Sequence, residues 1–227
     1  MDEQFSRSIG LLGEENFAKI QKANIAIFGL GGVGGTCLEA LVRTGFKNFA
    51  LCDFDKVDPS NLNRQILYTK NDIGKLKTEA AAYHITAINP NIFVAITDNK
   101  AQDFPFNEIG PIDFIVDAID DVGGKIFLAK EAEKRNIPFI MSLGMANRFD
   151  PSKVKIAKLN QTRNDPLAKK IRYMAKKEGL DLSRINVVIS EELPQKNGEK
   201  LYSTMMVPSS AGLSLAKFIL ETIIDKK

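Results

Sequence analysis

Three glycines and one carboxylate give this 227-residue chain its clearest chemical signature. Gly29, Gly31 and Gly34 form a G-x-G-x-x-G pattern directly after an apolar run, and Asp53 ends the next apolar run. Glycines at this spacing let a turn approach a phosphate closely and aim the N-terminus of the following helix at its charge. Asp53 stands where such folds place a carboxylate against a ribose hydroxyl. The pattern, in which Gly32 fills a further position, predicts a nucleotide site and leaves nicotinamide, flavin and ATP enzymes open.

Charged and amide side chains further along the chain favour a triphosphate over a dinucleotide. The segment 60–65 reads SNLNRQ, Lys77 follows it, and the apolar run 114–117 leads into the carboxylates of DAIDD. Because the carboxyl ends of parallel strands gather at one edge of a sheet, these groups can meet in one crevice. Cations there balance phosphate charge and a carboxylate can hold Mg²⁺, whereas hydride transfer needs neither. The candidates are Asp53, Asp55, Asn61, Arg64, Gln65, Lys77, Asp120 and Asp121.

The elements that must position these residues alternate along the chain. Strand-like apolar runs occur at residues 24–28, 49–53, 92–97, 114–117 and 139–142, and helical patterns occur at 34–44, 75–88 and 124–135. Such alternation predicts an α/β fold: a Rossmann-like, doubly wound and mainly parallel sheet with helices on both faces.

Residues 151–227 differ from the rest of the chain in charge. They hold 15 Lys and Arg against 8 Asp and Glu, whereas residues 1–150 hold 16 against 20. A half-exposed strand is predicted at 153–158, and Asn164-Asp165-Pro166 predicts a helix start with a capping side chain. We expect a small basic extension packed on the same domain. The nine basic residues and one acid between positions 153 and 177 fit a solvated helix face and a nucleic-acid footprint equally well.

Composition excludes several other classes of protein. Hydrophobic residues make up 44% and charged residues 26% of the chain, as in an ordinary soluble protein. Cys37 and Cys52 form no C-x-x-C pair and His84 is the only histidine, so neither a zinc site nor a Ser-His-Asp triad is expected. Residues 1–8 lack the apolar run of a signal peptide, and polar residues interrupt the segment 205–224, which predicts an amphipathic closing helix. A cytoplasmic protein without a membrane span is the expectation.

The motifs GLGGVGG, DFDKVDPSNLNRQ, Lys77 and DAIDD together resemble the adenylation domain of the family that includes ubiquitin-activating enzymes. The resemblance covers roughly residues 5–145. In that family ATP adenylates a carboxylate and pyrophosphate leaves, so the resemblance implies that residues 1–150 are an ATP-binding adenylation domain. It also implies roles for single residues: the glycines as nucleotide loop, Asp53 on the ribose, Asn61 and Arg64 on the phosphates, Lys77 on the α-phosphate, and Asp120 on Mg²⁺.

The resemblance extends to the N-terminus, where Arg7 in Phe5-Ser6-Arg7 matches the family's arginine finger. It implies a homodimer in which this arginine crosses into the partner subunit's site. Each role has a structural alternative. Arg64 and Lys77 can be surface charges, Asp120 and Asp121 can cap the next helix, and a short basic N-terminus is often disordered.

The C-terminal third resembles one branch of this family, the tRNA threonylcarbamoyladenosine dehydratases. The matching segments are DPSK, RNDPLAKKIR, VVISEELP and MVPSSAG. Branches that transfer the acyl group to a thiol need a later cysteine, and none follows Cys52. The branch implies ATP-dependent adenylation and cyclisation of the modified base, with tRNA as partner. Sequence-independent tRNA contacts are then expected from Lys153, Lys155, Lys169, Lys170, Arg172 and Lys176.

Two departures from the branch and three rival functions remain. Met145 and Arg148 occupy a turn that is richer in glycine in relatives, and Tyr202-Ser203-Thr204 replaces an expected glycine. The first rival function is adenylation of the C-terminal glycine of a ubiquitin-like or sulfur-carrier protein. The others are a non-catalytic nucleotide sensor and a nicotinamide oxidoreductase. An accessory protein is left open.

Overall fold

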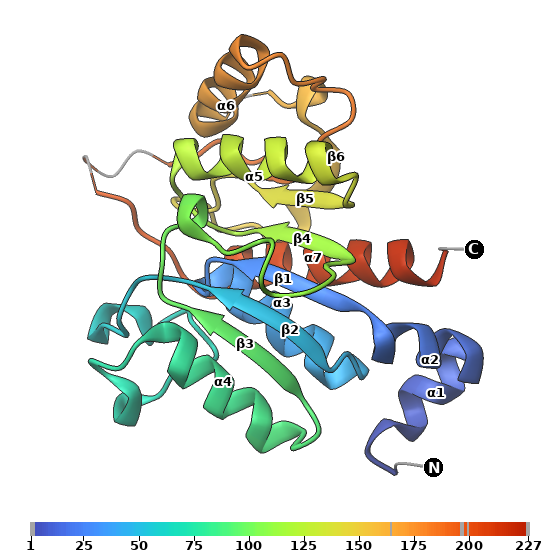
Figure 1. The fold of residues 1–227 in the computed structure, drawn as a ribbon. Coiled ribbons are helices and arrows are strands. Elements are labelled where there is room, and N and C mark those ends of the chain that lie inside the picture. The colour runs from blue at the N-terminus through green and yellow to red at the C-terminus, as the bar shows by residue number, and fades with distance from the viewer. Residues whose placement is uncertain (1–2, 164, 196–197, 199, 226–227) are drawn as a thin grey trace.

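A single seven-stranded sheet forms the centre of the molecule, with helices on both of its faces (Figure 1). The computed structural model describes residues 3–163, 165–195, 198 and 200–225. The strand order is β3-β2-β1-β4-β5-β7-β6, and every neighbouring pair is parallel except β6 with β7. The strands are β1 (Asn24–Phe28), β2 (Asn48–Cys52), β3 (Phe93–Thr97), β4 (Phe114–Asp117), β5 (Phe139–Ser142), β6 (Val154–Lys158) and β7 (Asn186–Ser190).

The predicted α/β class and the mainly parallel, doubly wound sheet are confirmed. The sheet is built outward from its centre, with β2 and β3 on one side of β1 and β4 and β5 on the other, which is the strand order of a doubly wound fold. The strand predicted at 153–158 is present as β6. Asn164, the first residue of the predicted helix start, lies outside the described residues.

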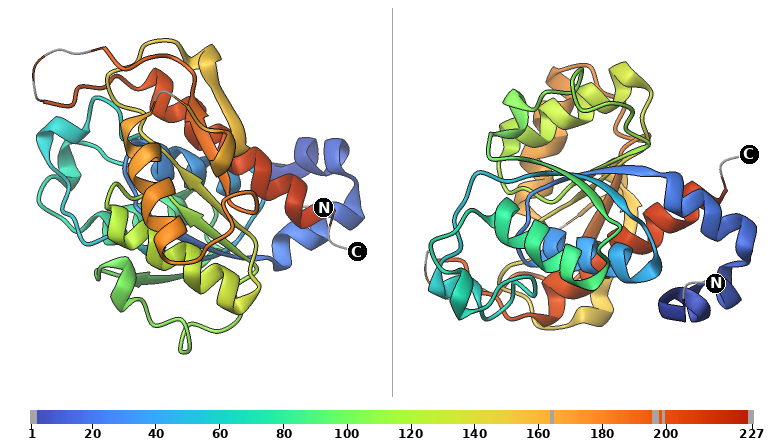
Figure 2. Two further views of the ribbon diagram at one scale, coloured as in Figure 1. Left: turned by 90° about the horizontal axis from the view of Figure 1, so that it is seen from above. Right: turned by 60° about the horizontal axis from the view of Figure 1, so that its bottom comes forward.

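The helices pack into two hydrophobic clusters. Figure 2 shows the arrangement of the helices around the sheet from two further directions. One cluster contains α3 (Gly32–Thr44), α4 (Lys77–Ile88) and α7 (Met206–Ile224), and the other contains α5 (Val122–Arg135) and α6 (Pro166–Lys177). Two short helices that the sequence patterns did not predict, α1 (Ser6–Leu12) and α2 (Glu14–Lys22), pack through Phe5 and Phe17. In Figures 1 and 2 they lie at the end of the sheet opposite the carboxyl ends of the strands.

The closing helix α7 is long and apolar enough to cross a membrane by length and composition alone. Here it packs along α3 as part of the core, and Val207, Leu215 and Ile219 are fully buried. At the crossing point, a Cβ on Gly212 would stand 2.4 Å from the carbonyl oxygen of Val33. Core packing therefore accounts for the apolar composition of this helix.

The basic extension, residues 151–227, adds its strands to the same sheet as the preceding residues. β7 inserts beside β5 and runs parallel to it, and β6 returns antiparallel along the outer edge of β7. Ser142 at the end of β5 and Ser190 at the end of β7 therefore lie at the same sheet edge as Asp53. Open α/β sheets bind their ligands at this edge.

Candidate functional site

A cavity of about 700 Å³ opens at the carboxyl ends of β1, β2 and β4. It lies at the point where the strand order reverses, which is where open α/β sheets bind their ligands. Most of the residues predicted from the sequence line this one cavity: Gly29, Gly31, Gly32, Asp53, Asp55, Arg64, Gln65, Asp120 and Asp121. Gly34, Asn61 and Lys77 are not among the lining residues.

The glycine turn is built by two contacts that no side chain would permit. Gly29 has a φ of +87°, and a Cβ there would lie 2.7 Å from the carbonyl group of Ala118. A Cβ on Gly34 would stand 1.9 Å from the carbonyl oxygen of Gly29. Gly34 thus brings α3 against the turn, whereas Gly29 and Gly31 form the cavity surface. The backbone at the start of α3 is left open for a phosphate.

Asp53 is positioned by the backbone of the same turn. Its carboxylate accepts hydrogen bonds from the N–H of Leu30 at 2.6 Å and from that of Asp55 at 2.9 Å. The residue is 8% exposed, and burial raises the pKa of the carboxyl above its ordinary value, while the charge of Lys77 acts to lower it. Asp53 thus joins β2 to the glycine turn and still presents an acceptor to the cavity.

Lys77 reaches the site through a second carboxylate. It begins α4, is only 5% exposed, and its Nζ lies 2.6 Å from Oδ2 of Asp55. Asp55 is half-exposed and lines the cavity. A buried ammonium paired with one half-exposed carboxylate is poised to share its charge with an anion that enters beside that carboxylate.

Arg64 and Gln65 approach the cavity from the loop after β2. Arg64 donates through Nη1 to the carbonyl oxygen of Ser60 at 2.8 Å and to Oδ1 of Asn63 at 2.9 Å. The predicted phosphate contact Asn61 instead accepts from the N–H of Asp58 at 3.1 Å and holds the turn. Oε1 of Gln65 is buried and accepts no hydrogen bond from any described residue. An orphaned acceptor in the lining fits a ligand that carries hydroxyl or amine groups.

The two carboxylates that follow β4, Asp120 and Asp121, have different surroundings. Asp121 caps α5, because its Oδ2 accepts from the N–H of Gly124 at 2.6 Å. Asp120 lines the cavity and is exposed. An exposed carboxylate beside a phosphate site has the donor chemistry that Mg²⁺ prefers. Asp120 therefore suits a metal and Asp121 a structural role.

Cys52 also lines the cavity, and its side chain is buried. Burial raises the pKa of its thiol to about 11, so the thiol stays protonated at neutral pH. Arg7 belongs to α1, a helix that Figure 1 shows at the end of the sheet opposite the carboxyl ends of the strands, where the cavity opens.

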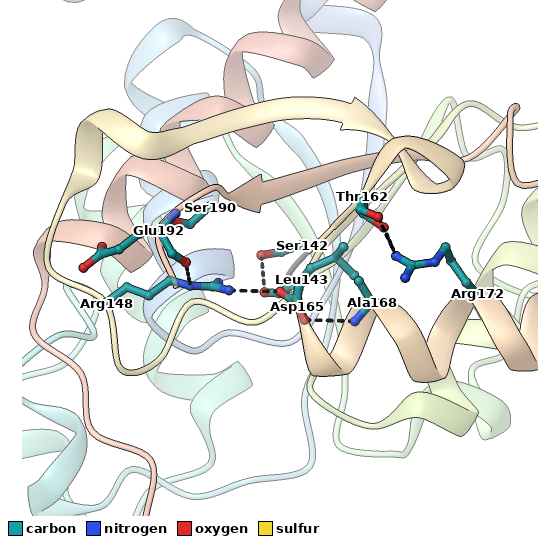
Figure 3. A network of polar contacts seen from close by, with 9 residues as sticks. All are labelled: Ser142, Leu143, Arg148, Thr162, Asp165, Ala168, Arg172, Ser190 and Glu192. Atoms are coloured by element: carbon teal, nitrogen blue, oxygen red, sulfur yellow. Dashed lines mark hydrogen bonds and ion pairs between the residues drawn. The ribbon is translucent and has the colours of Figure 1, made fainter. Parts of the chain in front are cut away.

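A buried polar network ties the start of α6 to the segments that follow β5 and β7 (Figure 3). Arg148 donates through Nε to the carbonyl oxygen of Glu192 at 3.0 Å, and its Nη2 lies 3.3 Å from Oδ2 of Asp165. Asp165 in turn caps α6 by accepting from the N–H of Ala168 at 2.9 Å. The departure at Arg148 therefore has a structural role, since both members of this ion pair are almost completely buried.

The predicted RNA-contact residues do not all present a free cation. Lys153, Lys169, Lys170 and Lys176 are exposed, while Lys155 forms an ion pair with Glu191. Arg172 is half-buried and donates to the carbonyl oxygen of Thr162 at 2.9 Å and to its hydroxyl (Figure 3). Arg172 therefore fastens α6 to the preceding turn, a contact that a helical charge pattern does not reveal.

Replacing Arg172 by methionine is expected to lower the free energy of unfolding by about 1–2 kcal/mol, because the buried carbonyl of Thr162 loses its charged donor. Lys170→Met, which removes an exposed cation two positions away, should change it by less than about 0.5 kcal/mol. Urea denaturation of both variants measures the difference. If both variants changed the free energy of unfolding equally, Arg172 would be a solvent-exposed cation like Lys170, without a stabilising contact to Thr162.

The chain is similar in sequence to a known protein family and to individual proteins of known name. The ThiF family matches residues 5–165. A tRNA threonylcarbamoyladenosine dehydratase of Bacillus subtilis is 36% identical over 197 residues, which is 86% of this chain and 77% of that protein. The tRNA threonylcarbamoyladenosine dehydratase 2 of Saccharomyces cerevisiae is 34% identical over 218 residues, which is 88% of this chain but only 46% of the yeast protein.

The likeness extends to a solved structure with a bound nucleotide. The tRNA N6-threonylcarbamoyladenosine dehydratase TcdA of Escherichia coli, crystallised in complex with ATP, superposes with a TM-score of 0.91. It is 29% identical, and the match covers 98% of this chain and 94% of TcdA. The likeness therefore includes residues 151–227 as well as the nucleotide-binding part.

Proposed function

The chain belongs to the ThiF family, and we propose that it uses ATP to adenylate the threonyl carboxylate of threonylcarbamoyladenosine in tRNA, which then closes into a ring. The observation that carries this proposal is the convergence of the glycine turn, Asp53, Arg64 and Asp120 on one cavity. The names of the Bacillus subtilis and Escherichia coli relatives supply the substrate class.

The first step joins a substrate oxygen to phosphorus. The threonyl carboxylate attacks the α-phosphorus of ATP, the bond to the β-phosphate oxygen breaks, and pyrophosphate leaves with the negative charge. Arg64 and the open backbone at the start of α3 hold the phosphates, and Lys77 stabilises the charge that develops on the α-phosphate. Mg²⁺, held by Asp120, supplies further charge neutralisation when bound.

The second step needs no nucleophile from the protein. A nucleophilic atom of the same modification attacks the activated carbonyl carbon, the bond to AMP breaks, and the ring closes with net loss of one water. Cys52 is protonated at neutral pH and no later cysteine follows it, in agreement with a reaction that forms no thioester. The protein's task is then to align the two groups.

The proposal includes a homodimer in which Arg7 enters the cavity of a second copy. The support is its place on exposed α1, far from the cavity of its own chain. Lys153, Lys169, Lys170 and Lys176 contact the tRNA backbone in this proposal, and the cytoplasm is the compartment where tRNA meets ATP. Arg172 is left out of the contact set because Thr162 occupies it.

Incubation of the protein with ATP, Mg²⁺ and tRNA that carries the open-ring nucleoside tests the proposal. Mass spectrometry of the digested tRNA should show a nucleoside lighter by one water, together with release of one AMP and one pyrophosphate per ring. Pyrophosphate release that responds only to a ubiquitin-like or sulfur-carrier protein would replace this function by carrier activation. ATP binding without any pyrophosphate release would indicate a nucleotide sensor.

A further inference from the structure

Tyr173 lies on the outer face of α6 and is 69% exposed. The residues three and four positions before and after it are Lys169, Lys170, Lys176 and Lys177, all of them exposed. Positions at these spacings are the nearest neighbours of a residue on a helix surface. Tyr173 therefore shares its exposed face of α6 with four lysines.

No acidic residue within α6 balances these four lysines, although the charge of Lys177 also acts on the neighbouring Glu178. α6 carries five cations and no acidic residue. Glu178, which follows the helix, pairs with Lys130 of α5 at 2.6 Å. In the described part of the chain, none of the four lysines belongs to an ion pair. The surface is therefore built to meet an anion from outside.

The helix that carries this surface is held firmly. Asp165 caps its first turn and is paired with buried Arg148, and Arg172 on its inner side donates to Thr162 (Figure 3). Asp165 also lies close to Gly144, where a Cβ would stand 3.5 Å from its Oδ2, just after β5. The first turn of α6 is thus fixed to the sheet edge at which the candidate site lies.

We propose that Tyr173 is a stacking platform for an unpaired nucleobase of the RNA, and that the four lysines hold the phosphates on either side of that base. This rests on the proposed function only in taking RNA as the partner. Lysines alone would bind any polyanion, but an exposed ring among them adds a face on which a base can stack. Only loops and single strands offer such a base, since bases in a duplex are stacked on one another. The surface then selects the loop of a hairpin over its stem.

A hairpin oligonucleotide with 2-aminopurine in its loop tests the stacking contact directly. We expect stacking on Tyr173 to change the fluorescence of 2-aminopurine when the protein binds. Tyr173→Ala should abolish that change and weaken binding of the hairpin about tenfold, while Tyr173→Phe should keep both. Tyr83→Ala is the matched control, because Tyr83 is 76% exposed on α4 and has no lysine among its neighbours at these spacings.

Salt dependence separates the ring from the charges. Tyr173→Ala should leave the slope of log affinity against log salt unchanged, whereas Lys169→Gln with Lys170→Gln should reduce it by about 2. Affinity for a fully paired duplex of the same length should not respond to Tyr173→Ala. Equal loss for hairpin and duplex, or no loss at all, would overturn the stacking contact. Tight, lysine-dependent binding of a polyglutamate peptide that ignores Tyr173 would instead assign the face to an acidic protein.

The proposal and the function it rests on can fail separately. If the fluorescence change depends on Tyr173 but no ring forms on tRNA with ATP, the stacking surface stands and the reaction is wrong. If ring closure proceeds with unchanged apparent affinity for tRNA in Tyr173→Ala, the reaction stands and the stacking contact is wrong.

Discussion

Replacing Lys77 by alanine is expected to slow adenylation by about 10²–10³-fold while leaving ATP binding largely intact. The ammonium of Lys77 is buried behind Asp55, 2.6 Å from its Oδ2, and so sits in a region where charge is poorly screened. We expect the Lys77 ammonium to stabilise the transition state, in which negative charge builds up on the α-phosphate, much more strongly than it stabilises bound ATP. Turnover of pyrophosphate release and ATP affinity by calorimetry measure the two quantities.

Two further variants make this prediction specific. Lys75→Ala removes an exposed lysine that forms an ion pair with Asp72 at the surface, and it should leave turnover unchanged. Loss of Lys77 also leaves the half-exposed Asp55 carboxylate unpaired, and its charge would then oppose the negative charge that develops on the α-phosphate in the transition state. Lys77→Ala combined with Asp55→Asn removes that repulsion. If the double variant regains near-normal turnover, Lys77 serves only to neutralise Asp55 and is not part of the mechanism.

The sheet and most of the cavity could be predicted because local patterns encode them. Each of the first five strands is a short apolar run, and each is followed by a turn with its own polar signal. Asp53 and Asp120 stand within two or three residues of strand ends, so parallel topology alone brings them to one edge. Gly29 was likewise recognisable, since a left-handed turn after a strand requires glycine.

What the sequence did not reveal depends on contacts between distant segments. Asp55 and Lys77 are 22 residues apart, and no local sequence pattern predicts that they form an ion pair. In the sequence Arg172 cannot be told from the other cations of α6, yet in the structure its guanidinium is hydrogen-bonded to the carbonyl oxygen of Thr162 and is not part of the exposed face. β7 is a short apolar segment between two loops. Its assignment as a strand depends on its pairing with β5 and β6, which the local sequence does not encode. Helices α1 and α2 owe their place to the packing of Phe5 on Phe17.

Gly34→Ala is expected to weaken ATP binding by about 10²-fold, because its methyl group would meet the backbone of the phosphate turn. The new Cβ would stand 1.9 Å from the carbonyl oxygen of Gly29, and a backbone atom cannot rotate away as a side chain can. The turn must therefore move by more than 1 Å, a displacement that costs on the order of 10²-fold in a site that depends on exact placement of its donors. Calorimetric titration with ATP measures the loss.

The neighbouring glycine supplies the control for this prediction. A Cβ on Gly35 would meet the side chain of Leu67 at 3.3 Å, which can shift by a few tenths of an ångström. Gly35→Ala adds the same methyl group at the next position of the same helix. It should keep ATP affinity within about threefold, because only the side chain of Leu67 has to repack. Circular dichroism of Gly34→Ala checks that the sheet is retained. Normal ATP affinity in a folded Gly34→Ala protein would mean that the phosphate turn is not formed by these glycines, and the nucleotide would have to bind elsewhere.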